Sequence, residues 1–221
     1  MISKDDILFW RLFALIQYMP ELTPAQLLNW LCQESDAGLD LEQLQSLSLG
    51  ELEARFPGDV SIMTLNRWQQ VMNCLNGELP EHLSVEPRHL MSNHLLVAFA
   101  SQDGLTINGH FGQCRLFFIY AFEGEYSWLY ALRRYPGESP DQEGNDVRAD
   151  LLKDCHLLFC EAIGGPAAAR IIRHNIHPVK VTPGTSISSQ REMLQTMLAG
   201  DLPPWLAKRL GKDNPLDNRV F

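Results

Sequence analysis

Residues 94–101 read HLLVAFAS, an almost unbroken apolar run. Such a run is typical of a strand buried on both faces of a sheet. The stretch HLLFCEAI at 156–163 has the same character. Between them, RLFFIYAF at 115–122 and SWLYALRR at 127–134 flank a short polar turn and predict a β-hairpin. These runs predict that the later part of the chain is built around a sheet.

Helical patterns alternate with strands after the hairpin. DVRADLLKDC and GGPAAARIIRHN, on either side of 156–163, predict helices, and ISSQREMLQTMLAGD predicts another. IHPVKVT at 176–182 predicts a strand, and LTI at 105–107 predicts a short one. Antiparallel strands followed by helical crossovers indicate an α/β fold on a mixed sheet.

The first third of the chain predicts short helices instead. Ser3 and Thr64 are placed to cap helices, and TPAQ at 23–26 and SLGE at 48–51 are capping boxes. The pattern gives four helices, or five if LEQLQSL also forms a turn. We expect an all-α domain at 1–78, a linker at 79–93 and an α/β core domain at 94–221.

Composition and charge narrow the class of protein. Residues 1–78 hold 4 basic and 11 acidic side chains, so this part carries −7 of the net −9. The negative electrostatic field of residues 1–78 favours binding to a basic protein surface and opposes binding to nucleic acid. No apolar run reaches the roughly 20 residues of a membrane span, and the first residues do not resemble a signal peptide, so we expect a cytoplasmic protein without membrane contact. The five cysteines form no CxxC pair, which argues against a disulfide framework or a structural zinc site.

The stretch DGLTINGHFGQCR at 103–115 is the first candidate site. His110 lies between Gly109 and Gly112, and Cys114 follows. Both glycines permit a positive φ and leave the loop little bulk, and imidazole is a common metal ligand. The alternative is a turn that needs its glycines and carries a solvated histidine. A closed zinc site needs about four ligands, so a metal bound here would have to bring most of its ligands with it.

The stretch IGGPAAARIIRHNIHPVK at 163–180 is the second candidate. Gly164 and Gly165 lead from a predicted strand into a helix, and free N–H groups at a helix start suit an anion. Arg170, Arg173 and Lys180 add positive charge. Close packing of small residues, with a solvated basic face, explains the same pattern equally well.

Enzymatic signatures are weak. Asp103 and Glu161 are the only acids beside the predicted buried strands, too few for a magnesium-dependent nuclease. The chain has no GxSxG elbow, and its Gly-Gly turn is not a P-loop. A phosphate-binding enzyme at the Gly-Gly turn stays a remote alternative.

Three motifs together resemble a known family. DGLTINGHFGQCRLFFIY, CEAIGGPAAARIIRHNIHPVK and MLAGDLPPWLAKRLGKDNP are similar to the nitrogenase accessory proteins of the NifX/NifY/NafY group, most closely its NifY type. The match covers roughly residues 94–210. The resemblance implies a ribonuclease H-like core without nuclease acids, and a sterile-alpha-motif-like helical domain before it.

The resemblance also implies a function and a site. The protein would be no enzyme: it would carry the iron–molybdenum cofactor, or a precursor, and bind dinitrogenase that lacks the cofactor. His110 would be the metal ligand, because it occupies the family's GHFG motif. The resemblance and the loops together indicate a binding site of His110, Asn108, Gly109, Phe111, Gly112, Cys114, Gly164, Gly165 and Arg170. The alternative is an interaction module that stabilises the apo-dinitrogenase without binding the cluster.

Overall fold

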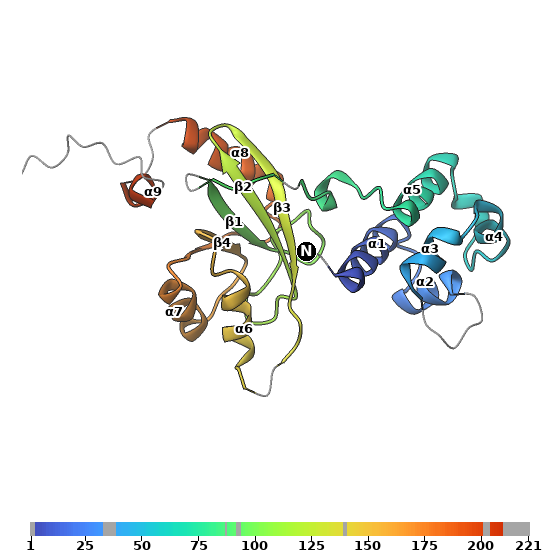
Figure 1. The fold of residues 1–221 in the computed structure, drawn as a ribbon, viewed down its shortest axis with the longest axis horizontal. Coiled ribbons are helices and arrows are strands. Elements are labelled where there is room, and N and C mark those ends of the chain that lie inside the picture. Colours follow the sequence, from blue (N-terminus) through green and yellow to red (C-terminus); the bar gives the residue numbers. More distant parts are fainter. Residues whose placement is uncertain are drawn as a thin grey trace, which may run out of the picture. The chain divides into compact units, whose positions relative to one another are not determined.

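A computed structural model describes residues 3–32, 39–86, 88–91, 94–138, 141–200 and 204–209 of the chain. The chain divides into two compact units, Met1–Ser84 and Val85–Phe221. The division falls within the segment 79–93 that the sequence predicts as a linker. Each unit is described by itself below, with the elements labelled in Figure 1.

The first unit is helical. Its elements are α1 (Lys4–Tyr18), α2 (Pro24–Leu31), α3 (Leu41–Ser46), α4 (Leu49–Ala54), the 3₁₀ turn η1 (Val60–Ile62), α5 (Leu65–Asn76) and the 3₁₀ turn η2 (Glu81–Leu83). The helix caps predicted from sequence form: the Ser3 and Thr64 side chains accept backbone N–H groups, and both capping boxes are complete. The LEQLQS segment is a full helix, α3, with a third capping box between Asp40 and Gln43.

Aromatic side chains fill the centre of the helical unit. The Trp30 ring lies 5.3 Å from that of Phe56 and 6.2 Å from that of Trp68. The indole N–H of Trp30 donates to the carbonyl of Leu52, so its polar atom is satisfied in the core. The helices therefore bury a core of their own.

The second unit is a mixed α/β layer. Its elements are β1 (Leu95–Ala100), β2 (Leu116–Glu123), β3 (Tyr126–Arg134), α6 (Gly144–Leu151), β4 (Leu157–Cys160), α7 (Gly165–Arg173), β5 (His177–Lys180), α8 (Ile187–Ala199) and α9 (Pro204–Arg209). The sheet order is β3-β2-β1-β4-β5. β2 pairs antiparallel with β1 and β3, whereas β4 pairs parallel with β1 and β5. The predicted α/β class, the hairpin and the mixed sheet are confirmed.

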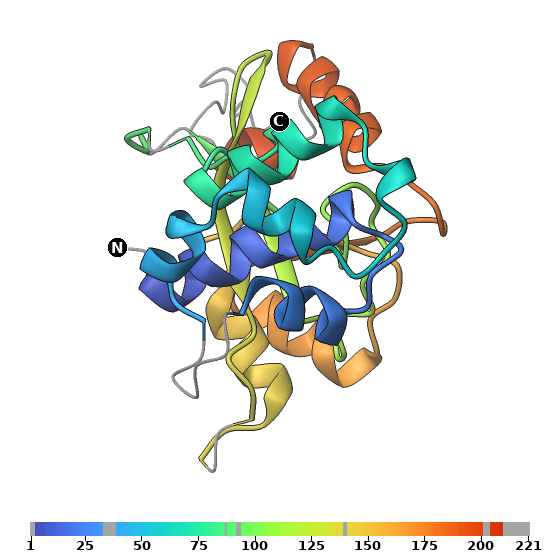
Figure 2. The same cartoon turned by 90° about the vertical axis from the view of Figure 1, so that its right-hand side faces the viewer.

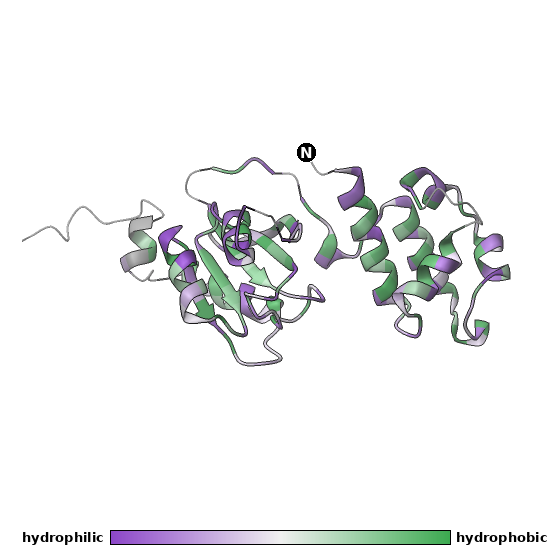
Figure 3. Ribbon diagram, turned by 90° about the horizontal axis from the view of Figure 1, so that it is seen from below, coloured by the Kyte–Doolittle hydropathy of each residue, from purple (hydrophilic) through white to green (hydrophobic). Residues whose placement is uncertain are grey.

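Helices cover both faces of this sheet (Figures 1 and 2). Alternate residues of β1, β2 and β4 form one cluster with Ala149 of α6 and Ile171 of α7. On the other face the Arg191 guanidinium of α8 lies 4.4 Å above the Tyr120 ring. β1 is buried along its whole length for this reason, and the central strands are hydrophobic in Figure 3.

One local prediction needs correction. LTI at 105–107 is not a strand: the structure shows only an isolated bridge between Thr106 and Ser186. The Asp103 carboxylate accepts the N–H groups of Leu105 and Thr106, and this bends the segment into a turn. Within the segment 79–93, Leu83 is fully buried, and Arg88 stacks 5.0 Å from the Trp128 ring centre.

Candidate functional site

The glycine–histidine loop lies at the carboxyl edge of the sheet, between β1 and β4. Gly109 N–H donates to the carbonyl of Ala100, where β1 ends, and the Gly109 carbonyl accepts from Glu161 N–H, just after β4. Phe111 N–H donates to Ala162, and His110 forms a parallel bridge with Ala162. After β1 the chain continues to β2 on one side, whereas after β4 it continues to β5 on the other side. The loop therefore lies at the topological switch point of the sheet, where open α/β sheets bind ligands.

Gly109 is required for packing. A Cβ atom at this position would lie 2.8 Å from the backbone of Ala100 and 2.7 Å from the sulfur of Cys114. Neither Gly109 nor Gly112 has a positive φ, so the loop does not use the backbone freedom that these glycines permit. Strand β1, rather than a ligand, is what lies close to Gly109. The missing side chain of Gly109 allows the loop to pack against the edge of the sheet.

His110 projects from this edge into solvent. Its side chain is 54% exposed, and its Nε2 atom lies 3.2 Å from Oε1 of Glu161. Within the described part of the chain Nδ1 has no hydrogen-bond partner. A carboxylate on one ring nitrogen fixes the orientation of an imidazole and leaves the other nitrogen to a metal.

Phe111 and Cys114 point the other way. Both side chains are fully buried in the cluster between the sheet and α6–α7. Cys114 Sγ donates to the Leu116 carbonyl, and burial raises the pKa of its thiol to about 11. The predicted contact of these two side chains with a ligand is not supported, because the turn that exposes His110 buries its neighbours.

Asn108 holds the preceding turn. Its Oδ1 atom accepts the N–H group of Gln102, and its Nδ2 atom donates to Asp103. The amide is thus occupied by the loop itself. Asn108 acts on the position of His110 through the backbone.

The Gly-Gly turn lies beside His110, as the bridge to Ala162 requires. Gly164 is the N-cap of α7 and supplies no side-chain cap, and both Gly164 and Gly165 are exposed. No atom lies within 4 Å of a Cβ built on either glycine, so neither is needed for packing. The helix start is open, and its N–H groups favour an anion there.

Arg170 is not free to complete this site. Its guanidinium pairs with Glu143 and, at 2.7 Å, with Asp146, so it joins α7 to α6. Lys180, in contrast, ends β5 at the same carboxyl edge as the histidine loop, paired in register with Cys160 of β4. Lys180 is therefore better placed than Arg170 to contribute positive charge beside the histidine loop.

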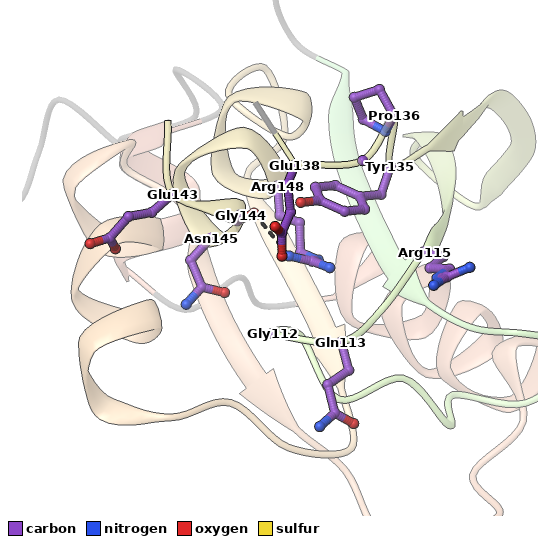
Figure 4. Close-up of a pocket in the computed structure, with 11 residues that line it drawn as sticks. Gly112, Gln113, Arg115, Tyr135, Pro136, Glu138, Glu143, Gly144, Asn145 and Arg148 are labelled. Carbon is purple, nitrogen blue, oxygen red and sulfur yellow. Dashed lines mark hydrogen bonds between the residues drawn. The ribbon is translucent and has the colours of Figure 1, made fainter. Parts of the chain in front are cut away.

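A pocket of about 830 Å³ opens next to the loop, and sequence reasoning missed it. It is bounded by Gly112, Gln113 and Arg115, by residues 135–138 after β3, and by Glu143, Gly144, Asn145 and Arg148 at the start of α6 (Figure 4). The lining therefore comes from two parts of the chain, the loop at 112–115 and the stretch 135–148. Only the run of polar residues around Glu143 hints at it in the sequence.

Among the described residues, no group of three or more His, Cys, Asp and Glu side chains is arranged to hold a metal ion. In the same residues, none of the helices has the length and apolar character needed to cross a membrane.

Comparisons with known proteins point in one direction. Residues 93–197 match the family model described as "Dinitrogenase iron-molybdenum cofactor". Protein NifY of Klebsiella pneumoniae is 56% identical over 94% of this chain and 91% of its own length. Protein NifY of Azotobacter vinelandii is 39% identical over 53% of this chain and 48% of its own, and Protein NifX of Sinorhizobium fredii is 34% identical over 62% and 89%.

Proposed function

Because this chain belongs to the NifX/NifY family of proteins involved in iron–molybdenum cofactor biosynthesis, we propose that it is a non-enzymatic carrier of that cofactor, or of a precursor, in the cytoplasm. His110 is the proposed metal ligand. The observation that carries the proposal is the exposed ring of His110 at the switch point of the sheet, with Nε2 on Glu161 and Nδ1 open.

A single imidazole suits a carrier. A preassembled cluster brings its own bridging sulfides, so few protein ligands are needed to hold it. A closed cage of thiolates binds metal too tightly for easy transfer. Cys114 and Cys160 are buried and largely protonated at neutral pH, so they leave His110 to act alone.

The surroundings of His110 suit an anionic cluster. The open start of α7 offers backbone N–H groups, and Lys180 offers a charge at the neighbouring strand end. We include Gly164, Gly165 and Lys180 in the proposed site and leave out the side chains of Phe111, Cys114 and Arg170.

The test is anaerobic titration of the chain with isolated iron–molybdenum cofactor. The His110→Ala variant should lose binding while it keeps its fold, because the ring is exposed and makes one hydrogen bond. His89→Ala is the matched control, since His89 is also exposed. Cofactor binding to His110→Ala at wild-type strength would refute the ligand assignment.

We also propose that the protein binds apo-dinitrogenase, with the helical unit contributing. The support is the concentrated negative charge of residues 1–78. If the wild type bound apo-dinitrogenase and took up no cofactor, the alternative of a pure interaction module would replace the carrier. The ribonuclease H-like assignment of the core and the sterile-alpha-motif-like assignment of the helices belong to this proposal as well, supported by the five-stranded mixed sheet and the short capped helices.

A further inference from the structure

The pocket beside the histidine loop contains a buried charge without a counter-charge. Arg148 is 7% exposed, and its Nε and Nη1 atoms donate to the carbonyls of Cys114 and Gly144, each at 2.9 Å. Its guanidinium stacks 3.7 Å above the Tyr135 ring. Within the described residues Arg148 forms no ion pair, and Nη2 has no partner. A buried guanidinium is normally paired with an anion. The Arg148 guanidinium is therefore suited to bind an anionic ligand from solution.

Two further features of the pocket favour an anion. Glu143, the N-cap of α6, provides no side-chain cap, and the N–H groups of Gly144 and Asn145, which line the pocket, have no hydrogen-bond partner among the described residues. Arg115 lines the pocket, is exposed, and makes no ion pair within the described chain. Two guanidinium groups and a helix start thus line the same pocket.

The pocket also contains acceptors that need a donor. Tyr135 Oη and Asn145 Oδ1 are shielded from water and have no hydrogen-bond partner in the described part of the chain. Glu138 lines the pocket without an ion pair among these residues, whereas Glu143 is held by Arg170. An unmade hydrogen bond at a buried polar atom destabilises the folded protein, and a ligand hydroxyl group can supply the missing partner.

We propose that this pocket is a binding site for a small hydroxycarboxylate. The carboxylate groups lie against Arg148 and Arg115, since the planar guanidinium matches a carboxylate with two parallel hydrogen bonds. The hydroxyl group bonds to Asn145 or Tyr135. At about 830 Å³ the pocket is within the size range of small-molecule sites. The proposal does not depend on whether His110 binds a cluster.

The test is isothermal titration of the full chain with three probes: citrate, tricarballylate (the same tricarboxylate without the hydroxyl) and inorganic phosphate. Citrate should bind at least about fivefold more tightly than either of the others, the effect of about one hydrogen bond. No heat with citrate, or equal affinity for citrate and tricarballylate, or for citrate and phosphate, would overturn the proposal.

Pocket variants locate the binding. Arg115→Gln should weaken citrate binding about tenfold by removing a charge-assisted bond, and Tyr135→Phe by a few fold. Gly144→Ala should abolish it, because the new methyl group would lie 2.9 Å from Tyr135 Oη and 3.0 Å from Arg148 Nη1. Arg173→Gln and Tyr126→Phe, exposed residues outside the pocket lining, are the matched controls.

Arg148 is a poor first target, because its loss would free two backbone carbonyls and could unfold the unit. Thermal melting of each variant without ligand separates unfolding from loss of binding. Unchanged citrate affinity in folded Arg115→Gln and Tyr135→Phe would place the binding elsewhere and refute the site.

Discussion

Nε2 of His110 and Oε1 of Glu161 lie 3.2 Å apart, and the backbone on both sides of this contact is fixed by hydrogen bonds. Glu161 N–H donates to Gly109, and Phe111 N–H donates to Ala162. The sheet edge therefore holds a carboxylate and an imidazole together although 50 residues separate them in the chain. The arrangement matches the carboxylate–histidine pairs that orient metal ligands.

The first prediction concerns Glu161. Glu161→Gln keeps the shape of the side chain and removes its charge, so it should weaken cofactor binding roughly 10–100-fold, the usual cost of losing such a partner. Nitrogen NMR of the His110 ring in the cofactor-free protein should show Nε2–H as the main tautomer in the wild type and a mixture in the variant.

Glu125→Gln, in the exposed turn between β2 and β3, is the matched control and should change neither measurement. An unaltered ring tautomer together with unaltered cofactor affinity in Glu161→Gln would show that the carboxylate does not position the ring.

The second prediction concerns the glycine that lets the loop join the sheet. Gly109→Ala should destabilise the protein by about 1–3 kcal/mol, because the methyl group would overlap the backbone of Ala100 and the sulfur of Cys114. Gly165→Ala is the control: nothing lies within 4 Å of its Cβ position and alanine favours a helix, so stability should stay equal or rise slightly. Urea unfolding measures both, and equal midpoints for the two variants would contradict the packing argument.

The sequence predicts the elements of this protein better than its site, and the reason is physical. Caps such as Ser3 and Thr64 act on residues three positions away, so local pattern is enough to find them. The buried strand within 94–101 can likewise be recognised in the sequence as a continuous run of apolar residues. The His110 ring is exposed, and its role as a metal ligand stays a prediction.

The failures involve residues whose partners lie far away in the chain. Arg170 reads as a free cation in sequence, but α6 supplies two carboxylates to it. Phe111 and Cys114 face the core because the loop pairs with β4, and sequence does not show that pairing. The Arg148 pocket was missed for the same reason, since the loop at 112–115 and the stretch 135–148 build it together.

The third prediction concerns the buried thiols. Burial raises the pKa of Cys74 and Cys155 to about 12 and that of Cys114 and Cys160 to about 11, from an ordinary value of 9.0. Above pH 9 the unfolded thiols ionise while the folded ones stay neutral, so ionisation favours the unfolded state. The stability present below pH 9 should therefore fall progressively between pH 9 and about pH 12.

Urea unfolding at pH 8, 9 and 10 checks the sign. Other groups also titrate in this range, so the informative quantity is the difference between the wild type and Cys160→Ala. The variant should lose less stability between pH 8 and pH 10 than the wild type does. An equal or larger loss in the variant would mean that Cys160 is not shielded as the fold indicates.

The fourth prediction separates the two units. The fragment 1–84 should fold alone, because Trp30, Phe56 and Trp68 form a core within it, and near-ultraviolet circular dichroism should report ordered tryptophans. It carries 4 basic and 12 acidic side chains, a net charge of −8, so its proposed binding to apo-dinitrogenase should weaken steeply as salt rises. The fragment 85–221 should bind cofactor in the same His110-dependent way and bind apo-dinitrogenase more weakly than the full chain. If 1–84 shows no affinity for apo-dinitrogenase and 85–221 binds it as tightly as the full chain, the helical unit has no part in the complex.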